Sequence, residues 1–159
     1  MGESSHILDA RRQGVAYADD YAAWIEHQLV LLRERRVDEI DFENLIDEVG
    51  DLGSEIFDKY ASAIEVVLLH MLKWDHQPTH RSRSWQLSIV EHRDRLIDVL
   101  RKNPSFKSRR GEAVSQAFRY GRVRAARETD LPLKHFPETC PYDWTAITTR
   151  EHPLPGDDA

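Results

Sequence analysis

The sequence contains a single cysteine, Cys140, among its 159 residues. One cysteine excludes an intrachain disulfide framework and every zinc site that is built from several cysteines. No apolar run approaches the ~20 residues that a membrane-spanning helix needs, and the first residues contain no apolar block typical of a signal peptide. These absences favour a soluble, cytoplasmic protein that does not cross a membrane.

The length suits one domain, and the 40% share of apolar residues is enough for one hydrophobic core. We expect a disordered tail over residues 1–16, a single helical domain over residues 17–149 and a flexible C-terminus over residues 150–159. The net charge is −6, but acidic side chains dominate residues 1–60 and basic side chains dominate residues 61–129. Either the two segments neutralise each other within the fold, or a basic end of the molecule attracts anions.

Apolar residues recur at steps of three and four, which predicts helices, and no segment alternates as a strand does. The periodic segments cover about residues 19–36, 41–74, 85–103 and 105–128. After Thr129 the chain becomes rich in proline, with a short helical turn expected near residues 144–148. Since short loops make neighbouring helices antiparallel, we predict an all-α fold. It is an antiparallel bundle of four main helices with one long central helix and a Pro-rich C-terminal arm.

The ends of the predicted helices carry recognisable signals. Asp41 is the expected N-cap of the second helix, and either Ser82 or Ser84 caps the third. The second helix is the longest, and Gly50 and Gly53 leave its continuity open because glycine weakens a helix interior.

Several stretches of the sequence together are similar to one bacterial family. They are YAAW at residues 21–24, LLRERR at 31–36, DFENLIDEV at 41–49, LLHMLKWDHQPTHRSRSW at 68–85 and ETDLPLKHFPETCPY at 128–142. The chain resembles domain-of-unknown-function family twenty-nine over residues 17–145. The family pattern usually has an aromatic residue where His76 stands and often a glycine where Asp130 stands. The resemblance implies an all-helical fold, and it implies no activity and no catalytic residues.

Arginines, serines and tryptophans gather where the third helix is expected to begin. The first amide groups of a capped helix are free to bind an anion, and arginine supplies a forked donor for phosphate or carboxylate. The predicted anion-binding site consists of Arg81, Ser82, Arg83, Ser84, His70, Trp74 and Trp85. In the alternative interpretation the arginines pair with acids such as Asp75, and the tryptophans belong to the core.

Histidine and cysteine chemistry has little support in the sequence. His70 lies on the flank of the apolar stripe, where a half-buried histidine bonded to a neighbour competes with a ligand or a general base. The metal-binding spacings Glu-x-x-His and His-Glu-x-x-His are absent, so no metal and no cofactor are expected. Cys140 has no nearby cue for a lowered pKa and is not expected to be catalytic.

Three charged or small-residue patterns have a structural and a functional interpretation. Acidic residues at 43, 47, 48 and 51 are expected to form a solvated helix face rather than a paired-carboxylate site. The arginines of the fourth helix would suit nucleic acid, against which stands the negative net charge. Small residues at 113, 117, 121 and 125 predict close packing within the chain, with a dimer contact as the alternative.

We therefore expect a non-enzymatic interaction protein or small-anion-binding protein, whose partner is a protein or a small anionic ligand. The alternatives are a nucleic-acid-associated module that uses the basic fourth helix, and an uncharacterised enzyme with its site in the bundle core. The sequence leaves homo-oligomer formation open.

Overall fold

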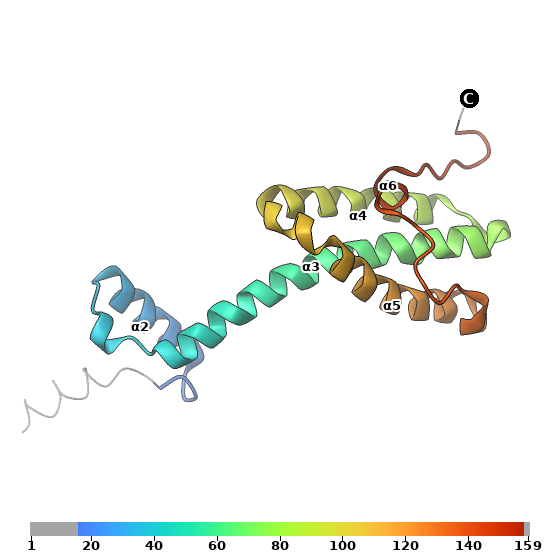
Figure 1. Ribbon diagram of the computed structural model, residues 1–159. Helices are drawn as coiled ribbons and strands as arrows, with labels where there is room; N and C mark the ends of the chain where they lie inside the picture. The colour runs from blue at the N-terminus through green and yellow to red at the C-terminus, as the bar shows by residue number, and fades with distance from the viewer. Residues whose placement is uncertain (1–15, 158–159) are drawn as a thin grey trace, which may run out of the picture. The chain divides into compact units, whose positions relative to one another are not determined.

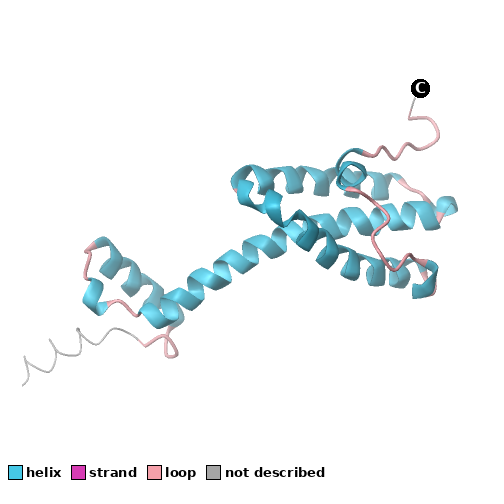
Figure 2. Cartoon of the chain, viewed as in Figure 1, coloured by secondary structure: helices cyan, strands magenta, loops and turns pink. Residues whose placement is uncertain are grey.

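The computed structural model describes residues 16–157, which form helices, turns and loops and no strand (Figures 1 and 2). The α-helices are α2 (Tyr21–Arg33), α3 (Phe42–His76), α4 (Arg83–Lys102), α5 (Arg110–Thr129) and α6 (Trp144–Thr149). Short 3₁₀ helices lie between them at Val37–Glu39, Pro78–His80, Pro104–Arg109 and Leu133–His135. The predicted all-α class and the short helix near residues 144–148 are confirmed. The predicted tail over residues 1–16 lies outside the described residues except for Ala16.

Polar side chains fix where four of the helices begin. Asp20, Asp41, Ser82 and Asp143 each accept a hydrogen bond from the backbone N–H three residues later, over distances between 2.7 and 3.4 Å. Such a cap satisfies an amide that has no partner inside the helix. The cap at Asp41 is confirmed, and of the two serines considered for α4 it is Ser82 that caps the helix.

Helix α5 begins later than predicted, and it ends at a residue in the left-handed conformation. The helix was expected from residue 105, but Pro104–Arg109 form a 3₁₀ helix and α5 begins at Arg110. Proline suits the first turn of a helix, and 3₁₀ turns are common at such ends. At the other end Asp130 takes the left-handed conformation, with φ 56°. Glycine adopts that conformation without strain, and aspartate tolerates it.

The chain divides into two compact units, residues 1–52 (unit 1) and residues 53–159 (unit 2). Helix α3 contributes to both, and it is continuous from Phe42 to His76, so Gly50 and Gly53 do not break it. The more detailed prediction of one four-helix bundle is not confirmed, because α2 belongs to unit 1 whereas α4 and α5 belong to unit 2.

In unit 1, α2 and the beginning of α3 form a hairpin. Trp24 donates its indole N–H to the Asp41 carboxylate over 3.0 Å, and the Asp41 backbone N–H donates to the Gln28 side chain over 2.9 Å. Farther from the loop, the Tyr21 hydroxyl donates to Glu48. Because residue 21 meets residue 48 while residue 28 meets residue 41, the two helices run in opposite directions.

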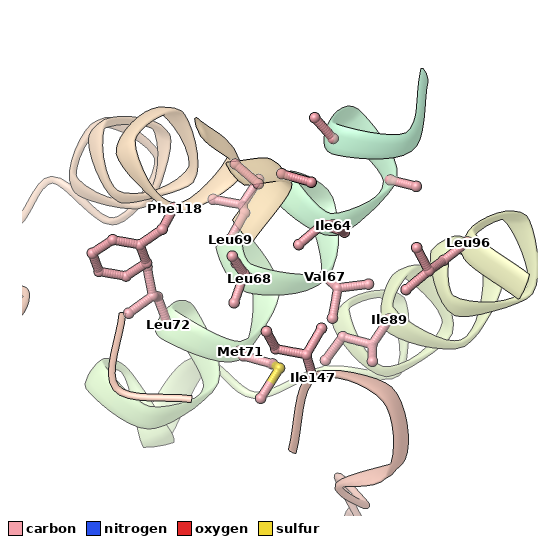
Figure 3. Close-up of a cluster of buried hydrophobic side chains, with 14 of the residues drawn as sticks. Ile64, Val67, Leu68, Leu69, Met71, Leu72, Ile89, Leu96, Phe118 and Ile147 are labelled. Carbon is pink, nitrogen blue, oxygen red and sulfur yellow. The ribbon is translucent and has the colours of Figure 1, made fainter. Parts of the chain in front are cut away.

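The hydrophobic core lies in unit 2 (Figure 3). Helix α3 supplies most of it, and side chains of α4, α5 and α6 close around that helix. Three ion pairs or hydrogen bonds join α3 to α5, at Asp58–Gln116, Glu65–Arg124 and Lys73–Glu128. The residue numbers rise together on both helices, so α5 runs in the same direction as this part of α3.

The stripe of small residues on α5 packs against α3. Ala113, Ala117 and Ala125 are fully or almost fully buried. A Cβ added at Gly121 would lie 3.2 Å from the backbone oxygen of Glu65, so the two helix backbones approach closely there. The predicted packing within the chain is confirmed, and these side chains are not available for the alternative, a dimer contact.

Candidate functional site

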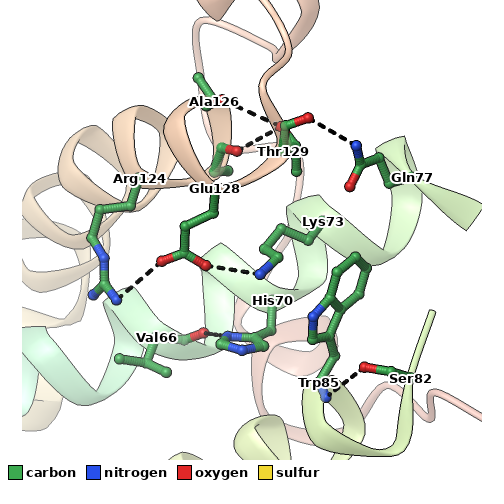
Figure 4. A network of polar contacts seen from close by, with 11 residues as sticks. Val66, His70, Lys73, Gln77, Ser82, Trp85, Arg124, Ala126, Glu128 and Thr129 are labelled. Atoms are coloured by element: carbon green, nitrogen blue, oxygen red, sulfur yellow. Dashed lines mark hydrogen bonds and ion pairs between the residues drawn. The ribbon is translucent and has the colours of Figure 1, made fainter. Parts of the chain in front are cut away.

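The serine cap and Arg81 lie together where α4 begins. The Ser82 Oγ accepts the Trp85 backbone N–H, as Figure 4 shows. Arg81 donates its Nε–H to the Trp74 carbonyl over 2.9 Å, and its guanidinium lies 5.2 Å from the centre of the Trp74 ring. Trp74 is 3% exposed. The buried tryptophan therefore holds Arg81 by its carbonyl and by a cation–π contact.

Arg83 contacts the C-terminal segment of the chain. Its Nη2 lies 2.5 Å from the Asp157 carboxylate, which also accepts hydrogen bonds from the Gln86 side chain and from the Leu154 backbone N–H. These donors lower the pKa of Asp157 to about 2, the Leu154 N–H having the largest effect. The positive charge of Arg83 is thus matched within the chain, as the alternative interpretation expected for the arginines, although with Asp157 rather than Asp75.

Lys73 is a buried cation that the sequence analysis did not include in the site. Its Nζ donates to Glu128 over 2.8 Å and lies 4.5 Å from the centre of the Trp85 ring (Figure 4). Glu128 also faces Arg124, at 3.5 Å, and the pKa of its carboxyl is lowered by Lys73 and Arg124 against the opposing effect of burial. The i, i+3 and i+4 spacing that locates a core face gives no signal for such a pair, because its partners are 55 residues apart.

His70 lies on the flank of the core, as predicted. Its Nδ1–H donates to the Val66 carbonyl over 3.0 Å, one turn earlier in α3. Burial, the largest effect, lowers the pKa of its imidazole. This matches the half-buried histidine bonded to a neighbour.

Asp75 pairs with residues of the proline-rich arm and its end, and not with the arginines at the start of α4. Two nitrogens of Arg150 lie 2.8 and 2.6 Å from its carboxylate oxygens, and the Tyr142 hydroxyl donates to it over 2.8 Å. Burial works to raise the pKa of Asp75, but Arg150 and Tyr142 outweigh it, so the pKa is lowered. Arg150 had been placed in a flexible C-terminus, and that assignment stays a prediction for the segment as a whole.

A shallow cavity of about 350 Å³ lies between α4 and the C-terminal segment. Arg93, Arg150, His152 and Asp157 are among its lining residues. Arg93 donates to the carbonyl oxygens of Ile147, Arg150 and Ala146, and Arg150 binds Asp75, so both cations are already engaged. The cavity therefore adds no unmatched cation to the start of α4.

The described residues bring together only part of the predicted site. Arg81, Ser82 and Trp74 are adjacent, whereas Arg83 turns to Asp157 and His70 bonds within α3. Among residues 16–157, no carboxylate forms an ion pair with Arg81. A fixed guanidinium beside the first amides of a capped helix can bind an oxyanion.

The described residues offer less support for a metal site or a nucleic-acid site. Within the described part of the chain, no group of three or more histidine, cysteine or carboxylate side chains could hold a metal ion. Arg109, just before α5, pairs with Glu112, and on α5 Arg124 pairs with Glu65 while Arg122 donates to backbone carbonyls. Those arginines are committed within the chain, and nucleic-acid binding stays a prediction.

Cys140 carries the single thiol of the chain. Cys140 is half-buried, its Sγ–H donates to the Tyr142 carbonyl over 3.5 Å, and burial raises the pKa of the thiol. A raised pKa disfavours the reactive thiolate.

No helix over residues 16–157 combines the length and the apolar character that crossing a membrane requires.

The comparisons with known proteins identify the family. The family model described as "Domain of unknown function DUF29" matches residues 16–152. The chain therefore belongs to this family, as the sequence resemblance implied. Comparison with curated proteins and with solved structures found no match.

Proposed function

We propose that this member of the DUF29 family is a non-enzymatic binding protein that recognises an oxyanion, phosphate or carboxylate, at the beginning of α4. The binding group is Arg81, together with the backbone amides of Arg83 and Ser84 and the Ser84 hydroxyl. Ser82 and Trp74 position these donors, and Trp85 follows them in the first turn of α4. The anion belongs either to a small ligand or to a partner protein.

The observation that carries the proposal is the setting of Arg81. Its Nε–H is fixed on the Trp74 carbonyl, so the guanidinium has less freedom to lose on binding. The nearby cations Lys73 and Arg83 each have a carboxylate, whereas Arg81 has none among the described residues. A positive charge held beside a helix N-terminus attracts an anion more strongly than either feature alone.

A carboxylate of the chain itself already lies in this region. Asp157 accepts hydrogen bonds from Arg83, Gln86 and Leu154, and these donors keep it ionised. This favours an oxyanion over other ligand chemistries, because the first turn of α4 offers donors and no acidic side chain. Arg83 therefore acts as a neighbour of the site rather than as a free binding group.

The groups around Arg81 support a non-enzymatic role. The closest titratable side chains are engaged, and Cys140 is held as a thiol. The same proposal places the protein in the cytoplasm, in keeping with its single cysteine.

The test is a thermal-unfolding panel with phosphate, sulfate and acetate at constant ionic strength, with sodium chloride as the reference. A ligand at 100 times its Kd stabilises the folded state by ~2.7 kcal/mol, which raises the unfolding midpoint by several degrees in a domain of this size. We expect such a rise for the wild type and none for Arg81→Gln. Arg127→Gln, which removes an exposed arginine from α5, is the matched control and should behave as the wild type.

Two results would contradict the proposal. One is a flat panel with every oxyanion. The other is an equal loss of the phosphate effect in Arg81→Gln and Arg127→Gln, which would indicate general attraction by positive charge. A short RNA added to the same panel separates the alternative function, since its effect should depend on the arginines of α5 and fall steeply with salt.

A further inference from the structure

Unit 1 exposes a set of large apolar side chains. They are Leu29 and Leu32 on α2 and Phe42, Ile46 and Val49 on α3, and they are between 42% and 66% exposed. We call these five residues the unit 1 apolar face. They follow each other at steps of three and four, so each helix presents them as one stripe.

The two stripes lie on the same side of the hairpin. Helix α2 contacts α3 through Trp24, Gln28 and Leu31, the residues of α2 that are buried. At ~100° per residue, Leu29 and Leu32 are displaced by roughly 110° from that contact line.

On α3 the half-buried positions 41, 44, 45 and 48 mark the contact line. Phe42, Ile46 and Val49 are displaced from it by roughly 110° in the same rotational sense. Two antiparallel helices are related by a two-fold axis perpendicular to both of them. Because each stripe is rotated from the α2–α3 contact line by a similar angle in the same sense, this symmetry places both stripes on the same side of the hairpin. The unit 1 apolar face is therefore continuous across the two helices.

Acidic residues of α3 point away from this face. Glu43, Asp47 and Asp51 lie roughly 100° to 180° around the helix from Phe42, and all three are exposed. The face itself carries no charged side chain, and a surface of this kind resembles the centre of a protein interface.

The area of the face suits a second copy of the chain. Unit 1 buries few side chains of its own, and isolated short helices are marginal in water. The five residues expose on the order of 500 Å² per chain, so pairing two such faces buries about 1,000 Å², where specific interfaces begin. Two-fold dimers are also the commonest protein assemblies.

The charges of the hairpin define how two copies would meet. The loop end carries three arginines and three acids, and Arg36 is paired with Glu34 and Glu39, so its charges balance. Residues 16–22 and 47–52 at the opposite end contain acidic and no basic side chains. Placing the loop end of one copy against the acidic end of the other keeps the two acidic ends apart and brings Arg33 and Arg35 near one of them. Parallel pairing would instead place the two acidic ends side by side.

We propose that the protein forms a two-fold dimer in which the unit 1 apolar faces of two copies pack against each other, with their hairpins antiparallel. Four helices, two from each copy, then enclose a core that neither hairpin completes alone. This inference is independent of the proposed anion site, which lies in unit 2.

The experiment measures the mass in solution by light scattering and by sedimentation over a range of concentrations. We expect the wild type to have twice the 18.5 kDa chain mass. Ile46→Glu places a charge in each copy of the face and should raise the dimer Kd by at least about 100-fold. Leu87→Glu changes a similarly exposed apolar residue on α4 of unit 2 and should leave the Kd unchanged.

A mixing experiment separates this dimer from other arrangements. Ile46→Lys alone should dimerise as poorly as Ile46→Glu, but an equal mixture of the two should dimerise at least about tenfold more tightly, because opposite charges then meet across the two-fold axis. Far-UV circular dichroism checks that both variants keep their helices. A wild type that stays monomeric at roughly millimolar concentration, a dimer insensitive to Ile46→Glu, or a mixture no tighter than its components would each overturn the proposal.

Discussion

Replacing His152 should make the protein less sensitive to acid. His152 is 5% exposed, and its ring lies 5.3 Å from the Trp74 ring in an edge-on contact. Burial, followed by the nearby charges of Arg150 and Arg93, lowers the pKa of its imidazole to about 4. The neutral ring is therefore the form that fits the folded protein.

The size of the effect follows from linkage between protonation and folding. An unfolded histidine has a pKa of about 6.5, so between that pH and about pH 4 the unfolded chain binds a proton that the folded chain does not. Stability is unaffected above pH 7 and falls as the pH falls through this window. The loss from His152 reaches roughly 2–3 kcal/mol at pH 4.5 and roughly 3–4 kcal/mol in full.

The assay is urea unfolding at pH 7 and at pH 4.5 for the wild type and for His152→Phe. Phenylalanine keeps a ring against Trp74 and does not titrate. The free energy of unfolding should fall by roughly 2–3 kcal/mol less in the variant than in the wild type. His80→Phe, at an exposed position, is the control and should keep the loss seen in the wild type. An equal loss in wild type and His152→Phe would refute the reasoning.

Substitutions at four further positions test the packing, each by urea unfolding at pH 7. Gly50→Ala should raise the free energy of unfolding by up to about 1 kcal/mol, because the added Cβ meets nothing within 4 Å. Gly121→Val should lower the free energy of unfolding by about 1–3 kcal/mol, because its side chain clashes with the α3 backbone. Equal effects of the two substitutions would contradict the close approach of α5 to α3. Leu68→Ala should cost about 2–5 kcal/mol, and a cost under 1 kcal/mol would mean that the core is not packed as described. Arg93→Ala should lower the free energy of unfolding by roughly 2–4 kcal/mol, because the carbonyls at the end of α6 lose the guanidinium that donates to them. Arg93→Lys should recover only part of that loss, because lysine lacks the forked guanidinium. Full recovery by lysine would contradict the three-carbonyl geometry.

The helices could be predicted because their signals are local. The period of three and four residues shows the apolar face of α3, and a serine or aspartate before a periodic segment shows where a helix begins. Which neighbour covers an apolar face is not a local property. Ile46 and Ile64 continue the same stripe of α3, yet Ile46 is 66% exposed and Ile64 is fully buried. The division into two units therefore could not be predicted from the pattern.

Some local features around the candidate site were predictable, but the partners of its charged residues were not. Capping by Ser82 and the half-buried position of His70 follow from spacing along one helix. Arg83 meets Asp157 across 74 residues, and Asp75 meets Arg150 across 75. Many carboxylates in the chain could satisfy such an arginine, and only the tertiary fold selects one. That Arg81 has no carboxylate partner among the described residues, whereas the nearby Lys73 and Arg83 have one, is known only once these pairs are known.

The most direct test of the anion site is a titration with inorganic phosphate at constant ionic strength, followed through the amide signals of the full ¹⁵N-labelled protein. We predict a saturable shift that is largest for the backbone amides of Arg83 and Ser84 and for the side chain of Arg81, and that disappears in Arg81→Gln. Shifts that never saturate, or that are largest along α5, would contradict the account.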